Sequence, residues 1–431
     1  MSATRSWLML CLSAGLGLWA MGGCGGSGSP TGDAADSSSQ VAATGLPTLA
    51  IPGQANAADP DDEDDEDDDM DDPEDDKATI EVPKAGTPER LVHEATKLLL
   101  AAPPATEDIA VLKKHRQEKN EKIVKLSQQA IELTHKDPEK ERLLNLAVHN
   151  LMEARTQLAL GGDADSIDLL NEDAAALFKR DPKSQAALEG AYAQVNLAYG
   201  MAKAAPADDV KWLHEFSRLA RQFAVNFPKE ERRSLPLLFA AGLSCELADE
   251  TKEAVVCYTL IRKEFPSSTF AARTGPILKR LKLVGSPPRI AGPTLAGDKL
   301  AIDDLLGKVV LVVFWSSETE PFQEQLPHLL KVIKKHSKRG LEVVGINLDQ
   351  DDIVLRKFTL DNKIAWPQIF YPEAEQRGWA HPLVVHYGVM DIPAYWLIDR
   401  NGNVVSTTVK ITALSSEIDK LLMVATEKQE N

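Results

Sequence analysis

The chain has 431 residues, 43% of them hydrophobic, which predicts two or three domains with ordinary cores. Its formal net charge is −17, but 15 of the 18 residues from 59 to 76 are acidic, so the rest of the chain carries only about −2. A balance this close to neutral gives no basis for binding a nucleic-acid backbone. We therefore expect no nucleic-acid partner.

Residues 1–24 have the features of a secretion signal. Arg5 precedes an apolar run that ends at Met21 and is too short to span a membrane. The run is followed by Gly22-Gly23-Cys24, which resembles the cleavage and lipidation site of bacterial lipoproteins, although leucine is usual where Met21 stands. We expect a lipid anchor at Cys24, with simple signal cleavage or an uncleaved anchor as alternatives. The mature chain would face an oxidising compartment of the cell envelope.

Residues 25–86 are predicted to form a disordered linker. They are rich in Gly, Ser and Ala and then almost purely acidic, without hydrophobic periodicity. A segment with so few apolar side chains cannot bury a core. Calcium buffering by the acidic run is an alternative, but the run lacks a glycine-containing loop with alternating ligands.

Residues 87–285 are predicted to be helical throughout, because apolar residues recur at helical spacing. Proline-containing helix stops recur at Pro138, Pro182, Pro228 and Pro266, and they are separated by 44, 46 and 38 residues. Such a period indicates stacked helical hairpins. A stack of this kind leaves a surface free for a protein partner, whereas the alternative is a helical spacer without a ligand.

The last predicted hairpin, residues 235–268, resembles the tetratricopeptide (TPR) repeat. Gly242, Ala254, Tyr258 and Pro266 stand where that family has two small helix contacts, a packed aromatic ring and a helix stop. The earlier hairpins have longer helices and are TPR-like only.

The chain has four cysteines, and none lies after Cys257. Cys11 and Cys24 fall in the predicted signal, while Cys245 and Cys257 fall on the two helices of the last hairpin. With a turn near residues 248–251 the latter two would sit at different heights, which favours two buried core residues over a disulfide.

Ser286-Pro287-Pro288 marks a rigid link to a second domain, residues 286–431, in which strands and helices alternate. Its predicted strands are 309–315, 341–348, 368–371, 394–398 and 404–408, and its predicted helices are 320–339, 352–362 and 413–426. An extended segment with a turn at residues 296–298 precedes them, and residues 400–403 form a hairpin turn. A βαβ core closed by an antiparallel hairpin and a helix is the thioredoxin arrangement.

This domain resembles the TlpA/ResA-type thiol-disulfide oxidoreductases and the redoxin (AhpC/TSA-like) families. The matching segments are Leu306-Gly307-Lys308-Val309-Val310, Val344-Gly345-Ile346-Asn347-Leu348-Asp349, Tyr387-Gly388-Val389, Ile392-Pro393 and Trp396-Leu397-Ile398-Asp399-Arg400-Asn401-Gly402. The resemblance implies a thioredoxin-like fold, a cis peptide bond before Pro393, and an active site at the start of the helix after residue 315.

The residues of that active site are replaced. When the family pattern is aligned on Phe314, Trp315, Pro321 and Pro327, the two cysteine positions hold Thr319 and Phe322. Two further departures are Glu318 in place of a tryptophan and Gln325 in place of the family's acid. Disulfide exchange requires a thiolate, which threonine cannot supply. We therefore expect no catalytic residues here and no cofactor.

A binding groove remains possible at this site. Its predicted lining is Trp315, Glu318, Thr319, Phe322, Ile392 and Pro393. We expect the rings of Trp315 and Phe322 to add apolar surface to it. Alternatively, Phe322 fills the place of the cysteine in the core and Pro393 serves only the turn.

The histidines at 328, 381 and 386 have no metal-ligand spacing, so we expect surface or packing roles and no metal site.

Three functions remain open. The first is a membrane-anchored envelope lipoprotein whose TPR-like repeats and redox-inactive thioredoxin-like domain bind proteins or peptides. The second is an enzyme of the thiol-disulfide oxidoreductase or peroxidase class, which the fold alone would suggest, although a fold does not carry function without its site. The third is a purely structural module.

Overall fold

The computed structural model describes residues 83–206 and 208–427, with side chains as far as Met423. All of these residues belong to one compact unit of the chain, Ile80–Asn431. Within it an all-helical part precedes an α/β part, as the sequence predicts.

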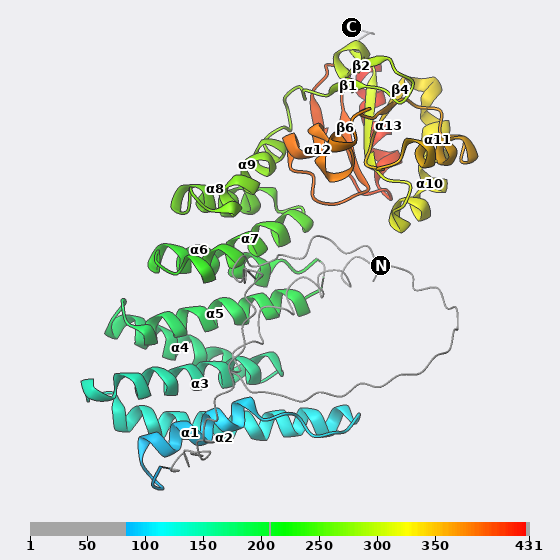
Figure 1. Ribbon diagram of the computed structural model, residues 1–431. Helices are drawn as coiled ribbons and strands as arrows, with labels where there is room; N and C mark the ends of the chain where they lie inside the picture. The colour runs from blue at the N-terminus through cyan, green and yellow to red at the C-terminus, as the bar shows by residue number, and fades with distance from the viewer. Residues whose placement is uncertain (1–82, 207, 428–431) are drawn as a thin grey trace, which may run out of the picture. The chain divides into compact units, whose positions relative to one another are not determined.

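The helical part, which we call the helical region, runs from Pro88 to Leu281, and Figure 1 shows its helices stacked in layers. Each helix packs on the next one in sequence, and α3 also packs on α1 and α5. The helices are α1 Pro88–Leu100, α2 Ile109–Thr134, α3 Glu141–Leu160, α4 Ala164–Arg180, α5 Gln185–Ala204, α6 Lys211–Asn226, α7 Glu231–Leu247, α8 Thr251–Glu264 and α9 Thr269–Leu281, with a short 3-10 helix at Pro138–Lys140.

The predicted helix stops are confirmed. Helices α4, α6 and α8 each end two residues before a predicted proline, and α2 ends four residues before Pro138. A proline disfavours helical backbone at the residue before it, which explains these ends. Ser184 and Ser268 then begin α5 and α9 as N-caps, since each hydroxyl accepts a backbone N–H of the first turn.

The α7–α8 hairpin has the close contact that its small residues predict. A Cβ added at Gly242 would lie 2.6 Å from the Tyr258 ring, so any other residue there would force the ring or a helix to shift. Ala254 and Tyr258 are fully buried. The turn between the helices, residues 248–250, falls where the sequence predicts it.

The α/β part, residues 286–427, has the predicted thioredoxin-like fold, and we call it the thioredoxin-like domain. Its main sheet has the order β5-β4-β3-β6-β7, with β3, β4 and β5 parallel and with β6 antiparallel to both β3 and β7. The strands are β1 Ala291–Pro293, β2 Lys299–Ala301, β3 Val309–Trp315, β4 Leu341–Asn347, β5 Gln368–Ile369, β6 Ala394–Ile398 and β7 Val404–Ser406. The helices are α10 Glu320–His336, α11 Asp352–Asp361, α12 Pro382–Tyr387 and α13 Leu414–Glu427.

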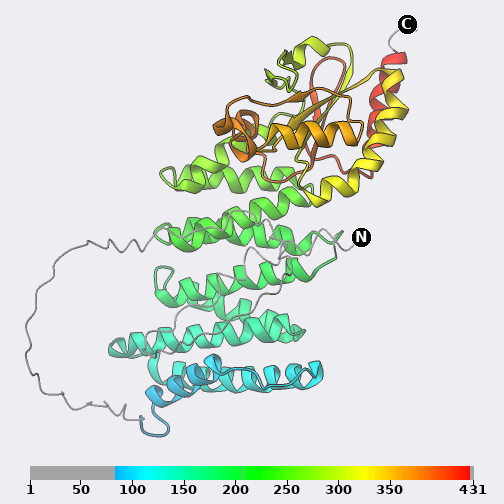
Figure 2. The same ribbon diagram turned by 45° about the vertical axis from the view of Figure 1, so that its right-hand side comes forward.

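Strand β3 is buried along its whole length because helices cover both faces of the sheet. Alternate residues from Val309 to Trp315 pack under α10, α11 and α13, whereas Val310, Val312 and Phe314 pack with α12 on the other face. Figure 2 shows α10 beside α13, in agreement with the contacts between these helices.

Most predicted elements of this domain match the structure within about three residues at either end, and β3 and β6 match at both ends. The extended segment before β3 is the β1–β2 hairpin. Helix α12 was not predicted, because six residues are too few to show a helical period. His381 begins it as N-cap and Gly388, with φ +58°, ends it.

Candidate functional site

The loop between β3 and α10 is held by a buried carboxylate at the end of the neighbouring strand. Asp349, which is 2% exposed, follows β4. Its Oδ1 accepts hydrogen bonds from Ser316 Oγ at 2.6 Å and from Ser317 N at 2.7 Å. Sequence reasoning gave Asp349 no role, although parallel strands β3 and β4 bring their carboxyl ends together at one sheet edge.

Thr319 occupies the N-cap position of α10 but does not cap the helix with its side chain. Its hydroxyl donates to the Ser316 carbonyl at 2.9 Å instead. Pro321 lies in the first turn of α10, where the missing N–H of a proline leaves no helix hydrogen bond unmade. The Thr319 hydroxyl is hydrogen-bonded to the loop backbone. None of its described hydrogen-bond partners is a base that could take its proton and make it a nucleophile.

Phe322 and Trp315 are both fully buried, so the prediction that their rings add surface to a groove is wrong. The two rings stack with centroids 4.4 Å apart, and Phe358 packs on both. Trp315 Nε1 donates to Gln368 Oε1 at 2.9 Å, which satisfies its polar atom. Phe322 lies on the face of α10 that turns toward the sheet. Burial of its large apolar ring there is more favourable than exposure to water.

Gln325 accepts a hydrogen bond from the Tyr395 hydroxyl at 3.0 Å through Oε1. Burial raises the pKa of Tyr395, so the phenol stays protonated and remains the donor. The pair links α10 to the start of β6. At position 325, where the resemblance implies an acid, the side chain is therefore a structural hydrogen-bond acceptor.

Pro393 lies beside the carboxyl end of β3, because Ala394 pairs with Phe314. The Ile392-Pro393 bond is cis, as the resemblance implies. Ile392 is 8% exposed and contributes to the core, whereas Pro393 is half-buried. Of the predicted groove residues, Glu318 is exposed and Thr319 and Pro393 are half-buried, so these three can still meet a partner.

The histidines show no metal-binding arrangement, and within the described part of the chain no group of three His, Cys, Asp or Glu could hold a metal ion. His381 is buried, which lowers its pKa to about 4, and its Nδ1 accepts from Leu383 N at the start of α12. His328 is exposed on α10. Lys279 Nζ lies 3.5 Å from His386 Nδ1.

The two cysteines of the helical region are free and fully buried. Burial raises the pKa of Cys245 to about 12 and also raises the pKa of Cys257. The Cys257 Sγ lies 3.3 Å from the Ser217 hydroxyl. Because the thiolate is the reactive form, neither thiol is a nucleophile near neutral pH.

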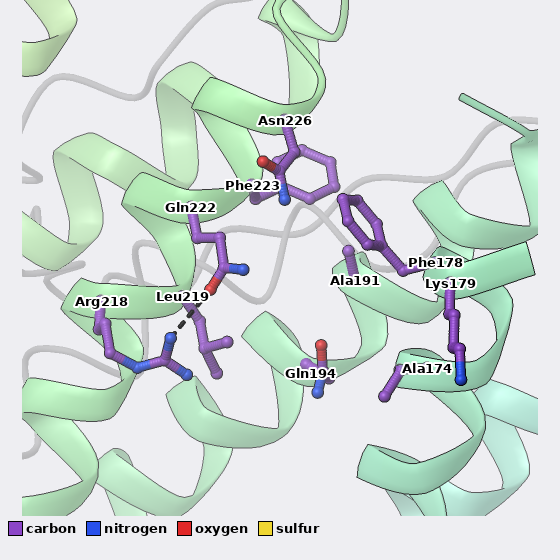
Figure 3. Close-up of a pocket in the computed structure, with 11 residues that line it drawn as sticks. Ala174, Phe178, Lys179, Ala191, Gln194, Arg218, Leu219, Gln222, Phe223 and Asn226 are labelled. Atoms are coloured by element: carbon purple, nitrogen blue, oxygen red, sulfur yellow. Dashed lines mark hydrogen bonds between the residues drawn. The ribbon is translucent and has the colours of Figure 1, made fainter. Parts of the chain in front are cut away.

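Hollows lie between helices in the described part of the helical region. Figure 3 shows the first, a cavity of about 350 Å³ between α4, α5 and α6, with the rings of Phe178 and Phe223 on one side and Arg218 bonded to Gln222 on the other. The second, of about 480 Å³, lies between α3 and α5 beside His149 and Glu189. Sequence reasoning identified neither, because hollows between helices depend on packing that no single motif encodes.

Cys24 and residues 1–82 lie outside the described residues. Among the helices that the structure does describe, none is long and apolar enough to cross a membrane.

Comparison with known proteins supports the thioredoxin-like assignment of the second part. Residues 286–407 match the AhpC/TSA family. The thiol-disulfide oxidoreductase ResA of Bacillus anthracis is 25% identical over 131 residues, which are 30% of this chain and 72% of that protein. ResA of Geobacillus thermodenitrificans is 26% identical over 160 residues, which are 35% of this chain and 77% of that protein.

Among solved structures, a thiol:disulfide interchange protein DsbE from Chlorobium tepidum, described as putative, is 27% identical and has a TM-score of 0.29. The match covers 33% of this chain and 98% of that one. The thioredoxin domain of a Bacteroides vulgatus thiol-disulfide oxidoreductase is 24% identical with a TM-score of 0.30. This match covers 32% of this chain and 97% of that domain's chain. All four similarities span only about a third of the chain.

Proposed function

We propose that this protein is a non-catalytic envelope lipoprotein in which TPR-like helices and a redox-inactive thioredoxin-like domain bind protein or peptide partners. The observation that carries the proposal is the start of α10, where Thr319 and Phe322 replace the family's thiols. Phe322 is a core residue there and Thr319 is bonded to the loop backbone. The only described thiols, Cys245 and Cys257, are buried with raised pKa values.

Binding is supported by what stays accessible. Glu318 and Thr319 lie on a loop that Asp349 holds in place, and Pro393 lies at the same sheet edge, in the segment that leads into β6. A surface that is fixed before binding loses less conformational entropy when a partner arrives. The stacked helices add a second surface, since stacked hairpins bury one face and leave another free. The proposal includes a lipid anchor at Cys24 and a partner in the envelope.

The second candidate is thiol-disulfide exchange, and the observation that favours it is the similarity to relatives named thiol-disulfide oxidoreductases. That chemistry needs a thiolate that attacks a disulfide sulfur. Since residues after Cys257 contain no cysteine, the domain itself cannot provide one.

Site-specific photo-crosslinking tests the binding proposal. A photoreactive amino acid at position 319 should give discrete crosslinked products with envelope proteins. The matched control is the same amino acid at Lys308, which is exposed at the opposite end of β3. Products at 319 that are absent at 308, and that Glu318→Lys weakens, support the proposal. Equal labelling at both positions, or none at 319, contradicts a binding surface at this edge.

A further inference from the structure

A buried cation joins the helical region to the thioredoxin-like domain. Arg280, near the end of α9, is 5% exposed. Its Nη2 lies 2.6 Å from Glu246 Oε1 on α7, and its Nε donates to the backbone carbonyl of Tyr387 at 3.2 Å. A buried guanidinium is tolerated only when its charge and its donors are matched, so these three groups depend on one another.

The contact continues from Tyr387 into the sheet. The Tyr387 ring packs edge-to-face on Trp396 of β6, with centroids 5.2 Å apart, and Trp396 packs on Phe314 of β3 at 4.8 Å. The Tyr387 hydroxyl accepts a hydrogen bond from Arg289 N at 2.7 Å. Tyr387 is thus fixed by the helical region at its carbonyl and by the domain core at its ring.

The next residue leaves no space between the two parts. A Cβ added at Gly388 would lie 2.7 Å from the backbone nitrogen of Ile277 on α9. Gly388 also has a φ of +58°, which disfavours other residues. Figure 1 shows α12 next to α9, and the two helices are in contact.

The segment that starts at this contact ends at the candidate site. After Gly388, Met390 packs against the apolar core of the helical region. Pro393 follows three residues later, and Ala394 is already fixed in β6. A segment this short, held at Gly388, at Met390 and at Ala394, has little freedom of its own.

We propose that Arg280 is a positioning residue through which the helical region sets the conformation of residues 388–393, the segment that presents Pro393 at the candidate site. The inference does not rest on the proposed binding function, since it concerns how the segment is held. It predicts that loss of the Arg280 contacts loosens the start of segment 388–393, while β3 and α8 stay as they are.

Amide hydrogen exchange of the full chain tests this proposal. The amides of Gly388 and Val389 both donate to the Val384 carbonyl, so their exchange reports opening at the end of α12. Arg280→Lys keeps a cation for Glu246 but loses the fork that also reaches Tyr387. We expect at least about ten-fold faster exchange at these two amides, and unchanged exchange in β3 and in α8.

The matched control is Lys410→Met. Lys410 Nζ lies 3.1 Å from Asp249 Oδ2, so this pair also bridges the two parts, but both side chains are more than half exposed. An exposed pair contributes little, so exchange at Gly388 and Val389 should stay as in the unmodified protein.

Three outcomes would overturn the proposal. The first is Arg280→Lys exchanging at 388–389 like the unmodified protein. The second is exchange that rises equally in β3 and α8, which would mean a general loss of stability. The third is Lys410→Met having the same effect as Arg280→Lys. Arg280→Met would also leave Glu246 without its cation. If that variant fails to fold, the Arg280→Lys result still decides whether the proposal holds.

Discussion

The α7–α8 hairpin and the start of α10 each carry the sequence pattern of a family, but they keep different parts of it. In the hairpin the small residue Gly242 and the ring of Tyr258 are both present, and they make the expected contact. At the start of α10 the strand, the helix and the cis proline are present, whereas Thr319 and Phe322 stand where the resemblance implies cysteines. The comparison teaches that the residues that pack a motif together can be present where the residues that give it reactivity are absent.

The start of α10 and the helical region as a whole also differ in the contacts that hold their helices in place. At the start of α10 the buried ring of Phe322 stacks on the ring of Trp315, the last residue of strand β3. In the helical region, Glu189 of α5 accepts hydrogen bonds from His149 of α3 and from Arg233 of α7. We therefore expect stability to fall when apolar volume is removed at the start of α10, and when charge is removed at the Glu189 contacts of the helical region.

The largest effect is expected for Phe322→Ala. Removing this fully buried ring leaves a cavity beside Trp315, and the free energy of unfolding should fall by about 3 to 5 kcal/mol. Phe322→Leu, which keeps most of the volume, should lose clearly less. Chemical denaturation of the full chain measures both variants. A loss below about 1 kcal/mol for alanine would mean that the ring is not a core residue.

The next effect depends on pH. Hydrogen bonds and charge from His149 and Arg233 outweigh burial and lower the pKa of Glu189 from 4.5 to about 2. A lowered carboxylate pKa stabilises the fold above the unfolded pKa, and this stabilisation is lost as the pH falls from about 4.5 through about 2. It amounts to at most about 3 kcal/mol.

Glu189→Gln should therefore lower stability at pH 5 and flatten its dependence on pH in the acid range. His149, whose pKa is raised chiefly by its hydrogen bond to Glu189, acts in the opposite sense: its contribution is present below pH 6.5 and is lost as the pH rises through the folded value. Urea denaturation at a series of pH values measures both. An acid limb that is the same in Glu189→Gln and in the unmodified protein would contradict the account.

Gly242→Ala should cost about 1 to 3 kcal/mol, because the new Cβ would press on the Tyr258 ring. In a Tyr258→Leu background the ring is gone, so the same substitution should cost less. A double-mutant cycle measures the coupling, which we expect to exceed about 0.5 kcal/mol. Strictly additive effects would show that the two helices do not meet as described.

The smallest effect is expected for Thr319→Val, which removes one hydrogen bond to the Ser316 carbonyl and no helix cap. The loss should be about 1 kcal/mol or less, and Thr319→Ser, which keeps the hydroxyl, should be closer to the unmodified protein. A loss near that of Phe322→Ala would give Thr319 a structural weight that its position does not explain.

Strands β3 and β6 were predictable to the residue because their apolar runs are bounded by turn residues and a glycine or proline lies close by. The helix stops followed from the prolines. Thr319 and Phe322 were correctly placed at the helix start, but whether Phe322 points inward depends on the rotation of α10 over the sheet. That rotation is set by packing against residues as distant as Phe358.

Asp349 and Arg280 show the same limit in a different form. Each is a single polar residue whose role arises from partners far away in the sequence, Ser316 for one and Tyr387 for the other. No local period or spacing identifies such a residue. The parallel pairing of β3 with β4 was the one available signal for Asp349, and α12, the partner of Arg280, was too short to predict.

The proposed absence of thiol-disulfide activity is tested most directly by the reduction of insulin disulfides by the full chain in the presence of dithiothreitol. An active thiol-disulfide oxidoreductase serves as the positive control, and the variant Cys245→Ala with Cys257→Ala serves as the matched negative control. We predict that the unmodified protein and this variant both react at the rate of dithiothreitol alone. A rate above that background that disappears in the double variant would contradict the account, because it would make the buried thiols of the helical region catalytic.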